Sequence, residues 1–306
     1  MYISMLKRLS NWVSQTKLSK VLYNRRSATK LKWNPSWFGA EKFDNILIDR
    51  IIDFQKAHGL TPDGLVGPTT YSRAFTNLEN IPKTTGRILC NGRLVRFNWP
   101  KVKIDLIKDG CYKKSKKERL PTMVVTHWDV CLSADSCKKV LEKRNISTHF
   151  VIDNDGTIVQ LADCNDIAWH AGNRRVNDAS IGVDFSNAYY TKYQKTYVKR
   201  GHGERPVLKD SVVHGVKLKP HLGYYPKQIM AYKALLEFLH EQYGIALTAP
   251  TKNGKLLTEV YKPAVAAKFN GIVCHYHLTR GKIDTAGLEL DEILYQLKEY
   301  TNGSKD

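Results

Sequence analysis

The strongest constraint on the fold is the order of apolar patterns after residue 120. Apolar runs too short for helices alternate with longer segments whose apolar residues recur at helical spacing. The strand-like segments are 121–130, 149–162, 180–188 and 271–278, and the helical ones are 226–245 and 288–300. One of them, 149–162, predicts a hairpin, with its turn at Asn154-Asp155-Gly156. This alternation predicts an α/β fold with a mixed β-sheet flanked by helices.

The composition predicts a soluble, strongly basic protein. The 306 residues are 42% hydrophobic, enough for a real core, and the formal net charge is +19. Such a charge favours polyanionic partners, namely nucleic acid, anionic lipid or acidic wall polymers. No run has the length of a membrane span, and the N-terminus lacks the apolar stretch of a signal peptide. Six cysteines are too few for a disulfide scaffold in a chain of this length.

The first 30 residues predict a basic N-terminal arm. Residues 1–40 contain no acid, and a second basic run follows at 111–119. In the arm, an apolar helix face is formed by Met5, Leu9, Trp12 and Val13. Two readings of this face remain open. It lies on an anionic outer-membrane or wall surface, or it docks on its own domain.

Residues 31–82 predict a small helical domain. Leu47, Ile51 and Phe54 share one helix face, His58-Gly59 ends that helix, and Pro68 starts another. The string FQKAHGLTPDGLVGPTT (54–70) resembles the signature of the three-helix peptidoglycan-binding module of wall hydrolases. The resemblance implies that this domain binds bacterial peptidoglycan. Residues 83–119 are expected to be a connector to the second domain.

Candidate metal ligands lie at two separated strand ends. His127 follows the apolar run 123–125, and the segment CHYHLTRGKIDTAG (274–287) brings further ligand types. A catalytic zinc takes three protein ligands and keeps a fourth position for water, and His127, His275 and Asp284 would supply such a set. His277 is an alternative to His275, since both fall on one face of a continuous strand. A less favoured set joins His127 to Cys131 and Cys137.

The same region resembles the zinc-dependent N-acetylmuramoyl-L-alanine amidases of type 2, a family with phage lysis amidases and animal peptidoglycan-recognition proteins. The blocks that carry the likeness are VVTHWDV, STHFVIDNDGTIVQL, AWHAGN, SIGVDF and CHYHLTRGKIDTAG. It implies a zinc amidase domain over 120–302, with His127, His275 and Asp284 as ligands and Lys282 as the catalytic lysine. The family's spacing favours His275 over His277. In the recognition proteins, two cysteines with the spacing of Cys131 and Cys137 form a disulfide. Two free thiols fit this sequence equally well.

The general base is expected to be Asp184. Family members use a Tyr before the His-Phe pair, where this chain has Thr148, or a Glu in the SIGIE strand, where it has Asp184. The residues expected to line the substrate groove are Thr148, His149, His170 and Asn173. A basic, aromatic insertion at 189–225 departs from the family pattern. It could form a lid, a substrate-binding loop or a solvated loop.

The sequence therefore predicts a peptidoglycan hydrolase that cuts the amide between N-acetylmuramic acid and L-alanine with zinc-activated water. A non-catalytic peptidoglycan receptor on the same fold is the alternative, although Asp284 speaks against it. A nucleic-acid-binding protein fits the charge, but no nucleic-acid motif is present, so none is expected as a partner. The expected setting is that of a monomeric phage endolysin or virion-associated lysin. It would be made in the host cytoplasm and act on the wall after holin-dependent release or delivery by the particle.

Overall fold

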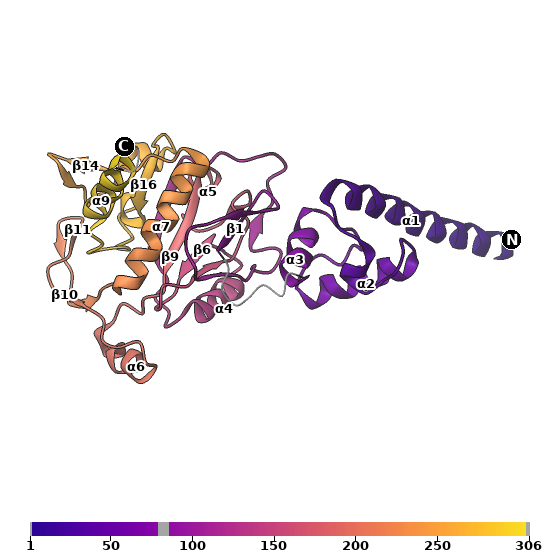
Figure 1. Ribbon diagram of the computed structural model, residues 1–306, viewed down its shortest axis with the longest axis horizontal. Helices are drawn as coiled ribbons and strands as arrows, with labels where there is room; N and C mark the ends of the chain where they lie inside the picture. Colours follow the sequence, from indigo (N-terminus) through magenta and orange to yellow (C-terminus); the bar gives the residue numbers. More distant parts are fainter. Residues whose placement is uncertain (1, 79–85, 304–306) are drawn as a thin grey trace. The chain divides into compact units, whose positions relative to one another are not determined.

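The computed structural model describes residues 2–78 and 86–303, and the chain divides into two compact units, 1–81 and 82–306 (Figure 1). Side chains are described for residues 17–74 and 86–298. Each unit is treated by itself below.

The first unit is helical. Its elements are α1 (Tyr2–Leu31), the 3₁₀ helix η1 (Pro35–Phe38), α2 (Asn45–Ala57) and α3 (Pro68–Leu78). The side chain of Asp44 caps α2 by accepting a hydrogen bond from the amide of Leu47. Leu47 and Ile51 are fully buried, as predicted, and Phe54 packs half-buried against the same cluster. The two predicted helices and the turn between them are therefore confirmed.

The later part of α1 belongs to this helical unit. Asn24 donates to the carbonyl of Gly64 and accepts from the amide of Val66, and Ser27 donates to the carbonyl of Val66. The helical domain was expected to begin at residue 31. In the structure it begins earlier, because the buried side chains of Asn24 and Ser27 hold the loop at Gly64 and Val66. The predicted apolar face of Met5, Leu9, Trp12 and Val13 lies outside the described side chains.

One buried amide organises the Asp-Gly turn of the module. Gln55 accepts from the amide of Gly64 at 2.8 Å and donates to the carbonyl of Leu65 and the hydroxyl of Thr70, both at 3.0 Å. Gly64 has φ +71°, and a Cβ there would lie 2.9 Å from Ile48 Cγ2. Glycine is required at this position by both its conformation and the space.

The second unit is built on a six-stranded sheet of order β16-β5-β9-β6-β7-β3. The strands are β3 (Val102–Ile104), β5 (Met123–Trp128), β6 (Phe150–Ile152), β7 (Ile158–Gln160), β9 (Ser180–Phe185) and β16 (Gly271–Cys274). All neighbours are parallel except β6 and β7, which form the predicted hairpin. The predicted mixed sheet flanked by helices is confirmed.

The segment expected to be a connector is part of this second unit from residue 86 onward. Strand β3 closes the edge of the sheet, and Ile88, Phe97 and Val102 lie in the main core. The structure thus differs from the expected connector at 83–119, because its apolar side chains complete the core. Smaller pairings in the unit are β1 (Arg87–Cys90) with β2 (Arg93–Arg96), β4 (Tyr112–Lys113) with β8 (Ile167–Ala168), and β14 (Thr251–Lys252) with β15 (Lys255–Leu256).

The two faces of the sheet are covered differently. Figure 1 shows α7 (Pro226–Tyr243) lying across β9 and β6, with α9 (Leu290–Gly303) beside it. The other face carries α4 (Ala134–Arg144), α5 (Arg174–Ala179) and α8 (Lys262–Val265). In β5, Val124 packs in the α7 cluster and Val125 in the α5 and α8 cluster. By strand alternation, His127 shares the face of Val125.

The insertion 189–225 is a folded body. Its elements are η2 (Thr191–Tyr193), α6 (Gln194–Lys199), β10 (Val207–Leu208), β11 (Val212–Val213), β12 (Val216–Lys217) and β13 (His221–Leu222). Arg205, only 2% exposed, donates to Gly223 O, Asn154 Oδ1 and Ser186 O. Its guanidinium also lies 4.6 Å and 4.3 Å from the ring centroids of Tyr197 and Tyr225. These contacts fasten the insertion to the hairpin turn and to the end of β9.

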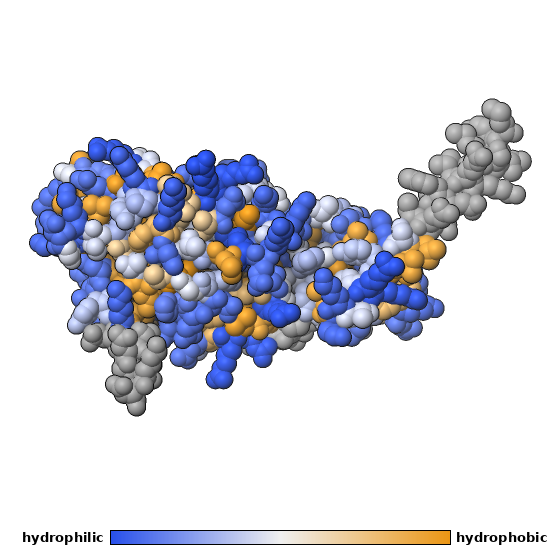
Figure 2. All heavy atoms as spheres, turned by 90° about the horizontal axis from the view of Figure 1, so that it is seen from above, coloured by the Kyte–Doolittle hydropathy of each residue, from blue (hydrophilic) through white to orange (hydrophobic). Residues whose placement is uncertain are grey.

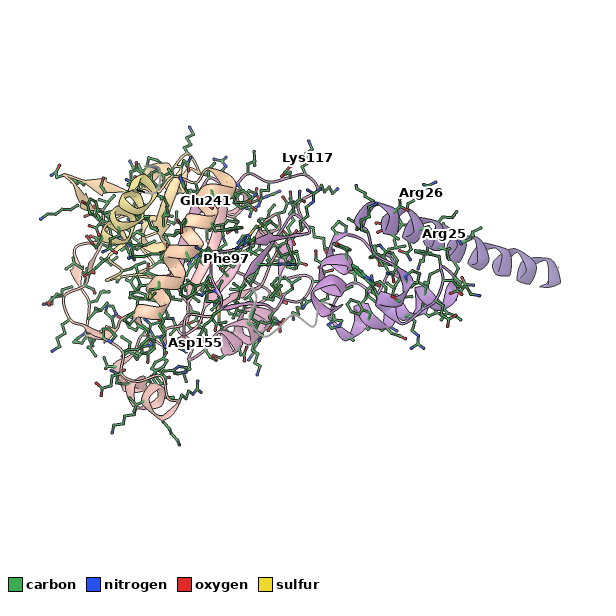
Figure 3. All side chains as sticks on the ribbon, in the orientation of Figure 1. Arg25, Arg26, Phe97, Lys117, Asp155 and Glu241 are labelled. Atoms are coloured by element: carbon green, nitrogen blue, oxygen red, sulfur yellow. The ribbon has the colours of Figure 1, made fainter. Side chains whose placement is uncertain are left out.

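The surface is mostly hydrophilic. Figure 2 shows polar side chains over much of the visible face, with smaller apolar groups between them. Arg25, Arg26 and Lys117, labelled in Figure 3, are all exposed. Arg119, at the end of the second basic run, is an exception because it is buried. Within the described part of the chain, no helix combines the length and the apolar character needed to cross a membrane.

Replacing Arg205 by Ala should destabilise the second unit, because buried carbonyl groups would lose their charged donor. The expected loss is about 2–4 kcal/mol of unfolding free energy, measured by urea unfolding. Arg200→Ala, at an exposed position of the same insertion, is the matched control and should change stability by less than about 0.5 kcal/mol. Equal stability of the two variants would contradict the anchoring role of Arg205.

Candidate active site

Three buried side chains converge on one point. His127 Nδ1 lies 2.9 Å from His275 Nδ1 and 3.2 Å from Asp284 Oδ2, and His275 Nδ1 lies 2.9 Å from Asp284 Oδ2. For a zinc ion bound at about 2.0–2.1 Å, the edges of a ligand tetrahedron are about 3.3 Å. The observed edges are close to that value. Among the described residues, this is the group of His, Cys, Asp and Glu that could hold a metal ion.

The sheet brings these three residues together. Strand β16 pairs in parallel with β5, so the two strands end at the same edge of the sheet. His127 lies in the end of β5, and His275 directly follows the end of β16. Asp284 follows in the next loop, where its carbonyl accepts from the amide of Tyr276 at 3.0 Å. The carboxyl ends of neighbouring parallel strands are where α/β sheets generally place their sites.

A chain of hydrogen bonds orients the His127 ring. Ser180 Oγ donates to Val176 O at 2.6 Å, so its free lone pair faces His170 Nε2 at 3.3 Å. His170 therefore carries its proton on Nε2 and accepts through Nδ1 from His127 Nε2 at 3.0 Å. This leaves a lone pair on His127 Nδ1, the atom that faces His275 and Asp284. Supporting bonds of this kind fix the tautomer of a metal-binding histidine.

Gly182 makes room for this chain. A Cβ at Gly182 would lie 2.7 Å from two atoms of the His170 ring and 2.8 Å from the hydroxyl of Thr148. Any side chain at this position of β9 would displace His170. The glycine of the SIGVDF block is therefore explained by a close approach rather than by backbone conformation.

Burial keeps His127 and His170 neutral. It lowers the pKa of His127 to about 4, helped by the neighbouring His275 and opposed by Asp284. Burial, and then His127, also holds the pKa of His170 well below its ordinary value. For Asp284, burial acts to raise the pKa, but the neighbouring His127 and His275 outweigh it and hold the pKa below its usual range. Two imidazoles and one carboxylate are a donor set that zinc prefers.

Asp184 lies beside the three candidate metal ligands His127, His275 and Asp284, the metal group. It is the cross-strand partner of His127 in the β5–β9 register, so both side chains emerge on the same face of the sheet. Burial raises its pKa well above the ordinary value, and Asp129 adds to the effect. The pKa of Asp129 is itself raised to about 8, mainly by burial. The site thus holds two carboxyl groups with a high affinity for protons.

These residues open onto one pocket of about 190 Å³. His127, His275 and Asp284 form one end of it, together with Asp184, His170 and the exposed Lys282. The further lining residues include Trp128, Val130, Val140, Arg144 and Trp169. The pocket thus combines the candidate metal ligands with apolar side chains and two cations, Lys282 and Arg144.

Three residues expected to line the groove do not do so. His149 and Thr148 are fully buried. His149 accepts from the amide of Gly182 at Nδ1 and lies 3.0 Å from Asp166 O at Nε2, so it braces two backbone segments. Asn173 caps α5, accepting from the amides of Arg175 and Val176. Of the four predicted groove residues, the structure places only His170 in the pocket.

The two rival metal sets are not assembled. Strand β16 ends at Cys274, and residues 275–277 form the 3₁₀ helix η3 (His275–His277), so the shared strand face expected for His275 and His277 does not exist. His277 instead accepts from the amide of Cys274 and contacts the carbonyl of Leu257. Cys131 and Cys137 are free thiols and do not join His127 in a ligand group.

The apolar and cationic wall was missed by sequence reasoning. Trp128 and Trp169 each stand next to a predicted histidine, His127 and His170, and this adjacency was the available signal. Arg144 ends α4, and sequence spacing gave no reason to bring it to the site. Only the packing of α4 against the sheet places it there.

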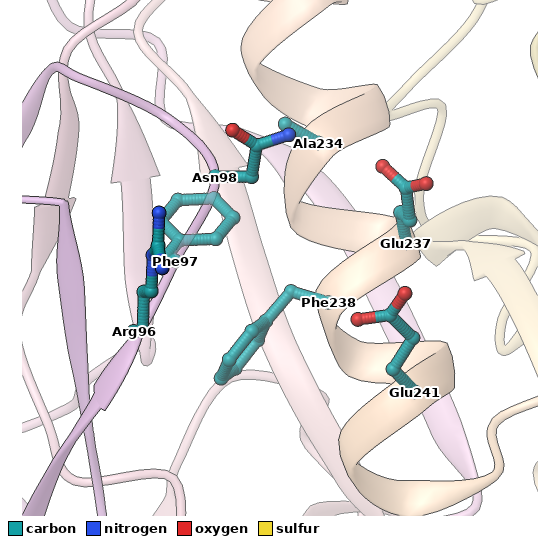
Figure 4. Close-up of a pocket in the computed structure, with 7 residues that line it drawn as sticks. All are labelled: Arg96, Phe97, Asn98, Ala234, Glu237, Phe238 and Glu241. Carbon is teal, nitrogen blue, oxygen red and sulfur yellow. The ribbon is translucent and has the colours of Figure 1, made fainter.

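A second pocket, of about 410 Å³, lies between the end of β2 and α7 (Figure 4). Phe97 and Phe238 form its apolar part, and the carboxylates of Glu237 and Glu241 project from α7. No histidine or cysteine is among its lining residues, and none of the metal group contributes to it. Although it is larger, it offers no comparable set of metal ligands.

Comparisons with known proteins agree with this geometry. The Amidase_2 family, described as N-acetylmuramoyl-L-alanine amidase, matches residues 116–285, and the PG_binding_1 peptidoglycan binding domain matches residues 14–73. No curated protein matches the sequence. The first match covers more than half of the chain and contains the metal group and Lys282.

Three solved structures are similar to parts of this chain. AmiD from E. coli, in complex with anhydro-N-acetylmuramic acid-L-Ala-D-gamma-Glu-L-Lys, is 18% identical over 70% of this chain and 66% of that chain, with TM-score 0.38. The endolysin LysCS from Clostridium intestinale is 16% identical, with 66% and 97% covered and TM-score 0.39. AmpDh3 from Pseudomonas aeruginosa, in complex with anhydromuramic pentapeptide, is 20% identical, with 63% and 66% covered and TM-score 0.38.

The fold and the site together define a hydrolase whose His, His and Asp group can hold a metal ion. The chain belongs to the N-acetylmuramoyl-L-alanine amidase family and is a peptidoglycan hydrolase with a peptidoglycan-binding domain.

His149 should make the stability of the metal-free protein depend on pH. Burial, followed by Arg119, lowers the pKa of His149 from 6.5 to about 3. Below pH 6.5 the unfolded chain therefore binds a proton that the folded chain excludes, and stability falls as the pH drops toward 3. In His149→Gln this contribution disappears, so the slope of unfolding free energy against pH should be smaller by up to about 1.4 kcal/mol per unit. Urea unfolding from pH 7 to pH 4 measures it. Identical slopes for variant and wild type would contradict the prediction.

Proposed function

We propose that His127, His275 and Asp284 hold a catalytic zinc ion and that Lys282 and Asp184 act beside it on the amide between N-acetylmuramic acid and L-alanine. The observation that carries the proposal is the triangle of donor atoms with edges of 2.9, 2.9 and 3.2 Å. Its donor types suit zinc, and the hydrogen bond to His170 supports the tautomer that zinc requires. The pocket beside the group leaves space for water and substrate.

When bound, the zinc ion supplies a water of lowered pKa and polarises the scissile carbonyl. The Lys282 ammonium lines the same pocket and stabilises the negative charge that develops on the carbonyl oxygen. Asp184 takes up the proton released as water adds to the carbonyl, and gives it to the leaving nitrogen. Its raised pKa suits a group that must hold that proton between the two steps.

The wall of the pocket orients the substrate. Trp169, which is 36% exposed, offers apolar surface to the pocket, and the exposed Arg144 at the end of α4 offers a cation. His170 acts through His127 rather than on the substrate, because its Nδ1 is engaged with the metal ligand.

The N-terminal unit holds the wall while the amidase unit cuts it. The match to a peptidoglycan binding domain supports this, and it begins at residue 14, within α1. A wall-binding module joined to an amidase suits an endolysin or a virion-associated lysin. The exposed basic residues suit an acidic wall polymer or an outer-membrane surface as a further contact.

A non-catalytic receptor on the same fold is the second candidate. Such a protein needs the groove but not the metal. The complete ligand triangle and Lys282 in the same pocket favour the enzyme.

Digestion of purified sacculi should release peptides with a new N-terminal alanine. The activity should disappear with a chelator and return when zinc is added, whereas His275→Ala should lose both the metal and the activity. Mass spectrometry of the products and metal analysis of the protein measure the two effects. New reducing sugar ends would indicate a glycosidase, and binding without cleavage in the zinc-loaded protein would indicate a receptor.

Lys282→Met should lower kcat by about 10²–10³ through the lost oxyanion charge while the zinc content stays stoichiometric. Lys282→Arg retains the charge and should keep more of the activity than the Met variant. Steady-state kinetics on a soluble muropeptide, together with metal analysis, separate the two variants. Loss of zinc in Lys282→Met would assign the lysine to metal retention instead of catalysis.

A further inference from the structure

The insertion presents a histidine at an unusual backbone position. Strands β11 and β12 form a two-residue hairpin whose turn is His214-Gly215, with φ values of 54° and 79°. Two positive φ values are typical of a turn that strongly prefers Asn-Gly. A histidine in place of asparagine suggests that its longer side chain is used.

His214 joins the hairpin to two other segments. Its backbone amide donates to Thr258 O at 2.9 Å, and its ring Nε2 lies 3.1 Å from Lys282 O. A carbonyl oxygen can only accept, so Nε2 carries the proton and donates it. The other ring nitrogen, Nδ1, is buried without a hydrogen bond among the described residues. The side chain therefore makes a single hydrogen bond, and that bond goes to the catalytic lysine.

The turn that carries Lys282 has few other restraints. Lys282 N donates to Thr279 O, and Gly281 N donates to Thr279 Oγ1, both at 3.3 Å. The bond from His214 is the shortest of the three described hydrogen bonds to residues 280–282. The Lys282 side chain is exposed in the pocket, so its ammonium position depends on how well this backbone is held.

The insertion also contacts the chain on the far side of Asp284. Gly287, at φ +70°, lies so close to β10 that a Cβ there would be 2.5 Å from Leu208 Cδ1 and 2.7 Å from Ser211 Oγ. Residues 208–214 therefore touch the segment at both 282 and 287. The backbone that carries Lys282 and Asp284 is held between these two contacts.

We propose that His214 is a positioning residue: its hydrogen bond to the Lys282 carbonyl fixes the catalytic lysine for the reaction. The inference rests on the role of Lys282 given under Proposed function. It assigns to the insertion the task of bracing the lysine turn. His214 itself touches neither substrate nor metal ligands.

Two amide variants separate the ring nitrogens of His214. Asn places its amide nitrogen near the position of Nδ1, too short to reach Lys282 O, and its backbone suits the turn. Gln places its amide nitrogen near the position of Nε2 and can still donate. The full-length, zinc-loaded protein is compared as wild type, His214→Asn and His214→Gln. His202→Ala, at an exposed histidine of the same insertion, is the control.

The first measurement is amide hydrogen exchange over residues 279–283, which does not require activity. His214→Asn should speed exchange there severalfold, and His214→Gln and His202→Ala should leave it near the wild-type rate. The second is kinetic. His214→Asn should lower kcat about tenfold with little change in KM, because a displaced charge weakens transition-state stabilisation, and His214→Gln should recover most of it.

Unchanged exchange in His214→Asn, or failure of His214→Gln to restore slow exchange while the variant remains folded, would overturn the proposal. So would faster exchange without any change in kcat. If the wild type itself shows no amidase activity, the function proposed for Lys282 fails, while the exchange data still decide whether His214 braces the turn.

Discussion

The site depends on three donor atoms that face one another. His127 Nδ1, His275 Nδ1 and Asp284 Oδ2 lie within 3.2 Å, in a place where burial keeps His127 neutral. Such an arrangement is favourable only if a proton or a cation lies among them. The parallel pairing of β16 with β5 holds two of the atoms together, and the Tyr276–Asp284 backbone bond adds the third.

The surroundings restrict this group from three directions. Behind His127, the bonds through His170 and Ser180 set the ring orientation, and Gly182 supplies the space they need. Beside it, α4 supplies the pocket wall. The insertion contacts the chain on both sides of Asp284, at Lys282 and at Gly287. The buried Arg205 in turn anchors the insertion. The precision of the site thus derives from contacts between segments that are distant in the sequence.

The sequence was enough to single out the candidate site residues and the order of the elements. His127, His275 and Asp284 could be assigned because strand ends and block spacing are local signals, and the hairpin and helices follow from periodicity. The local sequence did not predict which neighbours surround each side chain in the fold. His149 and Thr148 were expected in the groove, but they sit where the neighbouring strand covers them. The end of β16 at Cys274 depends on tertiary contacts of η3, so strand alternation failed at His277. Residues 83–119 were expected to be a connector, but the pairing of β3 with β7 and the burial of Ile88, Phe97 and Val102 are long-range contacts that make the segment part of the core.

The distance along the chain between His127 and His275 has a consequence for synthesis. His127 and His275 are 148 residues apart, and β5 has no β16 to pair with until the ribosome has made nearly the whole second unit. Contacts of such long range form late. A nascent chain that stops short of residue 284 can fold the β6–β7 hairpin but carries no third ligand. The complete donor group can therefore form only when translation of the second unit is almost finished.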